Sequence, residues 1–77
     1  MVQARRGPRS PKLGVVTEFD EPRGLGAVDA DDGYRYPFHC TAIADGTRRI
    51  DVGARVVFSR AAGHLGRIEA RSIQRIG

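Results

Sequence analysis

Glycine-containing turns divide the chain into short apolar segments, and this spacing limits most strongly what it can fold into. Turn residues gather at 20–24, 31–33 and 62–66, and the second turn holds an Asp-Gly pair. Such a pair is typical of tight hairpins because glycine tolerates positive φ. Between the turns, no 3.6-residue apolar period runs long enough for a helix that covers a sheet. The sequence therefore predicts an all-β domain.

Five segments rich in β-branched and apolar residues are expected to be strands. They span residues 13–19, 24–29, 34–40, 54–60 and 67–73, with one helical turn near residues 41–44. A domain of this size without covering helices removes its unpaired sheet edges by closing the sheet. We therefore expect a small closed antiparallel barrel over residues 13–77.

The alternation of side chains along each strand separates a core face from an outer face. The residues expected in the core are Val16, Val28, Tyr36, Phe38, Val56, Phe58, Ile68 and Ala70. The residues expected on the outer face are Arg35, Pro37, His39, Arg55, Val57, Arg67, Glu69 and Arg71. Because Pro37 has no backbone N–H, its strand must lie at an edge, a bulge or the barrel mouth.

The net charge of +4 lies entirely in the first twelve residues. Residues 1–12 hold four basic residues and no acidic one, whereas residues 13–77 hold nine of each. This segment has two prolines and no apolar periodicity, so we expect a flexible basic tail. Within the rest, residues 13–47 have a net charge of −5 (two basic, seven acidic) and residues 48–77 of +5 (seven basic, two acidic).

Several classes of protein are excluded by what the sequence lacks. No apolar run is long enough to span a membrane, and a single cysteine cannot form a disulfide framework. Two histidines and one cysteine are too few for an ordinary zinc site. His39 and Cys40 are neighbours in an expected strand and should point to opposite faces, so they form no nucleophile–base pair. We expect a cytoplasmic binding domain without enzymatic activity, metal or cofactor.

Residues 13–73 resemble a bacterial cold-shock domain. The resemblance lies in residues 14–20 (GVVTEFD), 23–28 (RGLGAV), 32–33 (DG) and 36–43 (YPFHCTAI), followed by glycines at corresponding places. It implies a five-stranded oligonucleotide-binding (OB) barrel, which agrees with the strand count. It also implies binding of single-stranded RNA or DNA by bases that stack on surface aromatic rings.

The chain departs from this family at the aromatic positions that carry stacking. Leu25, Ala27, Pro37 and Cys40 stand where the family has phenylalanine, and Glu18 stands in place of a tryptophan. His39 alone is retained. Each base–aromatic stack contributes about 1–3 kcal/mol to binding, so losing several of them predicts weak binding.

We therefore expect weak, sequence-tolerant binding of single-stranded RNA or DNA. The expected contacts on the barrel are Arg23, Leu25, Ala27 and His39, and those in the tail are Arg5, Arg6, Arg9 and Lys12. Four tail contacts predict a slope of log K against log salt of about −3. Arg23 has an ion pair with Glu21 as its alternative role.

Two further interpretations concern residues outside these contacts. Seven arginines in the second half are interpreted as neutralising the acidic first half, with a track for phosphates as the alternative. Tyr34 is interpreted as packing on its turn, with a place at the rim of the platform as the alternative.

A different class of function remains open beside nucleic-acid binding. The apolar, non-aromatic surface at Leu25, Ala27 and Pro37 suits a protein better than a base. The chain is then an interaction module that docks on a larger complex, such as a ribosomal or transcription complex, while the tail binds nucleic acid or an acidic surface of that complex.

Overall fold

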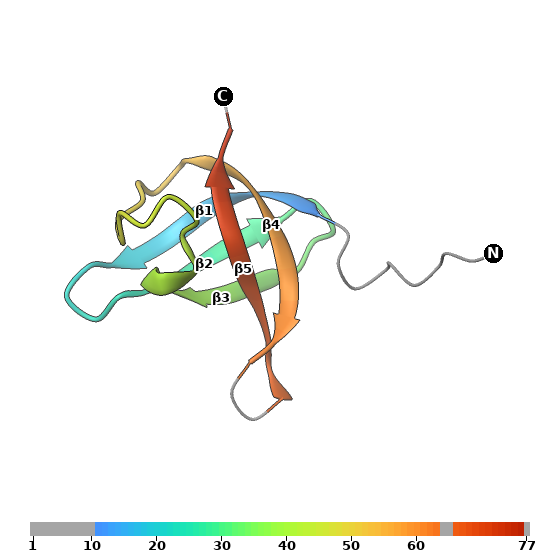
Figure 1. Cartoon of the computed structure of the whole chain (residues 1–77). Coiled ribbons are helices and arrows are strands. Elements are labelled where there is room, and N and C mark those ends of the chain that lie inside the picture. The colour runs from blue at the N-terminus through green and yellow to red at the C-terminus, as the bar shows by residue number, and fades with distance from the viewer. Residues whose placement is uncertain (1–10, 64–65, 77) are drawn as a thin grey trace.

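The computed structural model describes residues 11–63 and 66–76, and they form one five-stranded antiparallel sheet. The strands are β1 (Lys12–Asp20), β2 (Leu25–Ala30), β3 (Arg35–His39), β4 (Arg55–Ala62) and β5 (Ile68–Arg75), and a short 3-10 helix, η2 (Cys40–Ala42), follows β3. The spatial order is β3-β2-β1-β4-β5 (Figure 1). The all-β prediction with five strands is confirmed.

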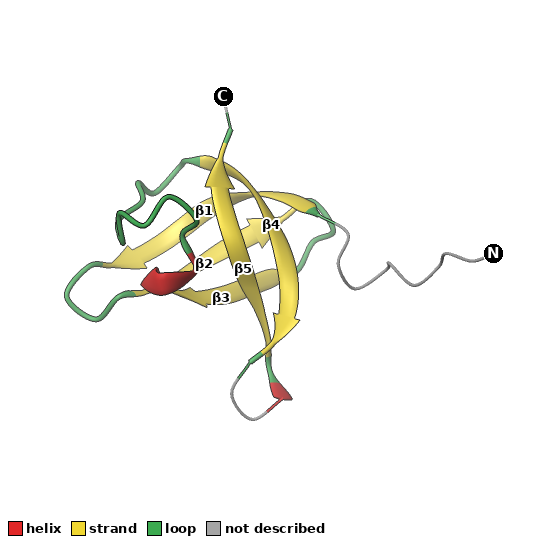
Figure 2. Ribbon diagram, viewed as in Figure 1, coloured by secondary structure: helices red, strands yellow, loops and turns green. Residues whose placement is uncertain are grey.

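The sheet curls so that its two end strands meet. Strands β3 and β5 contact each other, and Ile43, just after η2, forms a parallel bridge with Ile73 of β5. Figure 2 shows strands crossing over one another around a common interior, with η2 at one end. Complete closure of the ladder, which we expected from the sequence, stays a prediction.

The first strand begins one residue earlier than expected, so Lys12 belongs to the sheet and not to the tail. Its Cα is paired with that of Phe58 in β4, and its Nζ lies 3.2 Å from Oδ2 of Asp32. These two contacts order the residue. Three other expected tail contacts, Arg5, Arg6 and Arg9, lie outside the described residues.

The interior is filled by the alternating residues of the strands, as the pattern predicts. Seven of the eight residues expected in the core are buried, and Phe58 is the largest side chain that is fully buried. Ile43 and Ile50 complete the core from the segment between β3 and β4, where strand periodicity gives no signal.

The prediction that Ile68 lies in the core is wrong, since 47% of its surface is exposed. It lies at the first position of β5, beyond the interior, and Ile73 takes the buried place. The register changes between Ser59↔Arg71 and Val57↔Gln74, so β5 holds one extra residue. Ser72 has a φ of 54°, and this bulge turns both Ala70 and Ile73 inward.

Candidate nucleic-acid interface

The expected platform is the outer face of β2 and β3, and their register places its residues in pairs. Leu25 lies opposite His39, and Ala27 lies opposite Pro37. Leu25 is 47% exposed. Strand β3 is at one end of the sheet order, which agrees with the expected edge position of Pro37.

Ala27 does not offer the exposed contact that we expected, because only 7% of it is accessible. It is the middle residue of a row across three strands, with Pro37 on one side and Glu18 on the other. These larger neighbours cover its methyl group. Ala27 therefore forms the floor of the platform.

His39 ends β3 and caps the helical turn η2. Its Nδ1 accepts a hydrogen bond from the backbone N–H of Thr41 at 3.3 Å, and Nδ1 lies 3.1 Å from the Thr41 hydroxyl. An accepting Nδ1 places the proton of the neutral ring on Nε2. The cap holds the ring in one orientation at the end of the platform and leaves Nε2 as its donor.

The expectation that His39 and Cys40 point to opposite faces is wrong. Their Nδ1 and Sγ atoms lie 3.8 Å apart. Cys40 is the first residue of η2 and has left the strand, so the alternation of an extended chain no longer applies. The same Nδ1 already accepts the Thr41 N–H, and its interaction with the sulfur is at long range.

The turn between β1 and β2 packs closely against this end of β3. Gly24 has a φ of 67°, its N–H donates to Asp20 O at 2.8 Å, and its carbonyl accepts from Cys40 N at 2.7 Å. A Cβ on Gly24 would lie 2.8 Å from Cys40 Sγ and 3.9 Å from His39 Nε2. Only glycine fits this approach, and it holds the β1–β2 turn, which carries Arg23, against the end of β3.

Three arginines line one cavity at this end of the sheet. It measures about 360 Å³ and lies between the β1–β2 turn and the segment before β4. Besides Arg23, Arg48 and Arg49, it is lined by Glu21, Pro22, Gly24, Cys40 and Thr47. Arg23 pairs with Asp20 at 3.8 Å. Glu21, the partner expected from the sequence, pairs with Arg49 at 3.1 Å. The side chains of Arg23 and Arg49 are 71% and 72% exposed, so both remain accessible to a ligand.

A charged cluster that the sequence analysis missed occupies the middle of the outer face. Arg35 Nε donates to Asp29 Oδ1 at 2.7 Å, and Nη1 of the same side chain lies 3.3 Å from Glu18 Oε2. Hydrogen bonding to Arg35 holds the pKa of Asp29 below its ordinary value. The same bond raises the pKa of Arg35. The outward position of Arg35 was predicted, but its partners come from two other strands.

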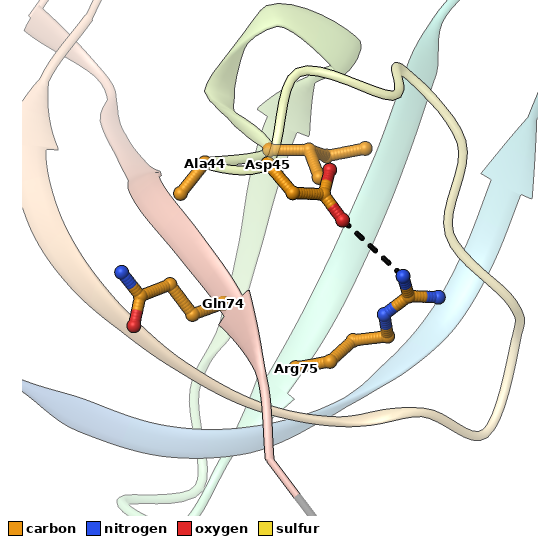
Figure 3. Close-up of a pocket in the computed structure, with 5 residues that line it drawn as sticks. Ala44, Asp45, Gln74 and Arg75 are labelled. Atoms are coloured by element: carbon orange, nitrogen blue, oxygen red, sulfur yellow. Dashed lines mark hydrogen bonds and ion pairs between the residues drawn. The ribbon is translucent and has the colours of Figure 1, made fainter.

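Other arginines of the second half pair with carboxylates, and those whose partners lie in the acidic first half fit the neutralisation hypothesis. Arg71 pairs at 3.7 Å with Glu69, which belongs to the second half itself. Arg75 pairs with Asp45 at 3.2 Å across a cavity of about 390 Å³ between β5 and the loop after η2 (Figure 3). Hydrogen bonds from Thr47, together with Arg75, lower the pKa of Asp45. This pair joins the loop to the sheet.

Neither a metal site nor a membrane span is seen within residues 11–63 and 66–76. No three His, Cys, Asp or Glu side chains of this part of the chain are grouped to hold a metal ion. In the same residues, no helix has the length and apolar character to cross a membrane.

Comparison with known proteins gives a similarity in structure. No protein-family model matches the sequence, and no curated protein matches it. A solved structure of Drosophila Unr, CSD456, superimposes with a TM-score of 0.74 at 23% sequence identity and covers 95% of this chain. The fold is cold-shock-like. The matched region is 29% of the Unr chain, so the present chain spans less than a third of that structure.

Proposed function

We propose that this domain binds single-stranded nucleic acid, RNA or DNA, weakly and with little sequence preference. The contact surface is the end of the β2–β3 platform where Arg23, Leu25 and His39 meet. Leu25 lies opposite His39 in the ladder and is about half exposed. In this proposal a base lies against the imidazole and the leucine while phosphates are held beside them.

The observation that carries the proposal is the convergence of three arginines on one cavity that is also lined by Cys40, the residue after His39. One of them comes from the β1–β2 turn and the other two from the segment before β4, which is far away in the sequence. Arginine presents planar donors that match phosphate oxygens, and electrostatic contact with phosphates needs no particular base. Cys40 of the lining follows His39, the family-like stacking residue that the chain retains, so the proposed phosphate and base contacts lie at the same end of the sheet.

The charged cluster of Arg35, Glu18 and Asp29 supports weak binding. Two carboxylates and one guanidinium lie where the resemblance implies stacked bases. Their net charge of −1 disfavours a phosphate chain, and no ring is present there to compensate. Basic residues at Arg5, Arg6 and Arg9 add attraction that does not depend on base identity.

A protein-interaction module is the second candidate, and the same cluster favours it. Leu25 and Pro37 present apolar surface beside paired charges, which is a composition typical of protein interfaces. In that case the domain docks on a ribosomal or transcription complex. The expected place of action, the cytoplasm, stays a prediction in both cases.

Arg23→Gln and Arg71→Gln form a matched pair of variants that tests the proposal. Each removes one positive charge, but Arg71 lies on β5 beside Glu69 and away from the cavity. Titration with a labelled single-stranded oligonucleotide of mixed sequence should show weaker binding for Arg23→Gln and near wild-type affinity for Arg71→Gln. In parallel, amide shifts in NMR spectra should move at Leu25 and His39. Equal losses in both variants, with no shifts on the platform, would contradict the proposal and favour the protein module.

A further inference from the structure

Tyr34 is the most exposed large apolar side chain in the part of the chain that the structure describes, at 68%. It lies just before β3, at the hairpin that joins β2 to β3. Its ring meets Tyr36 edge-on, with centroids 6.5 Å apart and an angle of 62° between the rings. Tyr36 is buried in the core and Tyr34 is outside it, so one edge of the Tyr34 ring is supported while most of its surface faces solvent.

Asp32 holds this hairpin in place. One carboxylate oxygen accepts the Tyr34 backbone N–H at 2.9 Å. The other accepts the Tyr36 hydroxyl at 2.8 Å and lies 3.2 Å from Lys12 Nζ. The hairpin is also joined to β1 through Asp31 N and Leu13 O at 2.9 Å. An aromatic side chain on a turn that is held in this way loses little conformational entropy when a ligand stacks on it.

Two cationic side chains lie at the same hairpin, Lys12 and Arg60. Lys12 uses one of its three ammonium donors on Asp32, and the others remain available. Arg60 of β4 approaches the Tyr36 hydroxyl, where it opposes the rise in the pKa of Tyr36 that burial causes. Its Nε is buried without a hydrogen-bond partner in the described residues. Asp31 and Asp32 are equal in number to these two cations.

We propose that Tyr34 is a second contact for single-stranded nucleic acid, where a base stacks on its ring and Lys12 holds an adjoining phosphate. This inference rests on the proposed function but uses a different surface. Tyr34 precedes His39 by five residues, so the two contacts lie about 17 Å apart along β3. Arg35 and its two carboxylate partners lie between them.

This arrangement explains how a domain with few stacking residues binds a single strand of nucleic acid. Bases stack on any exposed aromatic face, and the sequence preference of such a contact is small. The hairpin lies beside the start of β1, where Lys12 pairs with Asp32 (Figure 1). A nucleic-acid strand that contacts Lys12 therefore passes the hairpin that carries Tyr34.

Three variants of the full chain test the inference by titration with a labelled single-stranded oligonucleotide. Tyr34→Ala should weaken binding roughly 5- to 150-fold, which corresponds to the loss of one stack worth about 1–3 kcal/mol. Tyr34→Phe should bind as the wild type does, because the ring is retained. Val52→Ala, which truncates another exposed side chain (61%) in the loop before β4, should also leave affinity unchanged.

Tyrosine fluorescence supplies a direct signature of stacking. The chain has two tyrosines and no tryptophan, so in Tyr34→Phe the buried Tyr36 is the sole emitter. Quenching on addition of the oligonucleotide should be seen in the wild type and lost in Tyr34→Phe, although both bind.

The possible outcomes separate this inference from the proposed function. If Tyr34→Ala binds like the wild type while Arg23→Gln binds more weakly, the platform stands and the Tyr34 contact is overturned. If Tyr34→Ala is weakened and Arg23→Gln is not, the Tyr34 contact stands and the platform is overturned. Absence of any binding by the wild type overturns both.

Discussion

Arg35 of β3 and Asp29 of β2 form the shortest ion pair of the described residues, at 2.7 Å between Nε and Oδ1. They lie directly opposite each other in the ladder. The same guanidinium reaches Glu18 of β1, so one arginine joins three strands on their outer face. The centre of the expected base-stacking surface is thus a charged network.

Replacing Glu18 by Trp should increase affinity for single-stranded oligonucleotides. The change removes a carboxylate from the path of the phosphates and supplies a ring, and one stack contributes about 1–3 kcal/mol. Glu18→Gln is the control, since it removes the charge without adding a ring and should give a smaller gain. Fluorescence anisotropy measures both affinities. No gain in affinity in either variant would mean that the bound oligonucleotide does not pass over this part of the sheet.

Acid should destabilise the domain partly through Asp32. Hydrogen bonds from the Tyr34 backbone and the Tyr36 hydroxyl lower its pKa from the ordinary value of 3.8. A carboxyl whose pKa is lower in the folded state stabilises that state above the unfolded pKa, and this contribution is lost as the pH falls through the folded pKa. The free energy of unfolding of the wild type, measured in urea, should therefore decrease below about pH 4. Asp32→Asn should be less stable at neutral pH and should lose less stability on acidification. Parallel pH profiles would contradict this role.

Truncating Ile73 should destabilise the fold strongly, whereas the same change at Ile68 should not. Ile73 is fully buried and Ile68 is half exposed. The free energy of unfolding should fall by about 2–5 kcal/mol in Ile73→Ala, which leaves a cavity. It should fall by about 0.5 kcal/mol or less in Ile68→Ala, where the side chain is exposed. Ile73→Val, with an expected loss of about 0.5–1.5 kcal/mol, keeps the measurement possible if the alanine variant does not fold. Chemical denaturation gives these values, and equal losses at both positions would show that β5 has a different register.

Gly24→Ala should displace the turn from the end of β3. Its backbone has positive φ, and a Cβ would meet Cys40 Sγ at 2.8 Å. We expect lower thermal stability, shifted amide signals at His39 and Thr41, and weaker oligonucleotide binding. Gly53→Ala, in the segment before β4, is the matched control, since its φ is also positive (96°) but a Cβ there meets nothing within 4 Å. It should lose stability and keep affinity, so an equal loss of affinity would argue against a contact at His39.

Removing residues 1–10 should reduce the dependence of binding on salt. The segment contains Arg5, Arg6 and Arg9. Three phosphate contacts contribute about −2 to the slope of log K against log salt for a single strand. Lys12 is held in β1 and remains in the truncated chain. Affinities measured at several salt concentrations give the two slopes, and identical slopes would exclude these arginines from the interface.

Much of the fold was predictable because it depends on local pattern. Period-two alternation identified Val16, Val28, Val56 and Phe58 as core residues, and the Asp-Gly pair located the hairpin before β3. The prediction failed where one residue broke the period. Ser72 adds a bulge in β5, and the buried position moves to Ile73. Nothing in the local sequence marks a serine as the residue that takes positive φ.

The candidate site was predictable to a smaller extent. Resemblance pointed to Arg23, Leu25 and His39, which the structure places at one end of the sheet. It also pointed to Ala27, which its neighbours on adjacent strands cover. Arg48 and Arg49 join Arg23 around a cavity through a loop that carries no strand pattern.

The sequence by itself determined the class of fold, the strands and the location of the net charge, because turn residues and side-chain alternation act between near neighbours in the chain. Tertiary structure alone decided which charges meet. Arg35 joins Asp29 and Glu18, and Asp32 joins Tyr36 and Lys12, through strands that lie side by side only once the sheet has formed. Ion pairs and cavities depend on distances of a few ångströms between such strands, and these distances follow from register and bulges that composition and periodicity do not encode.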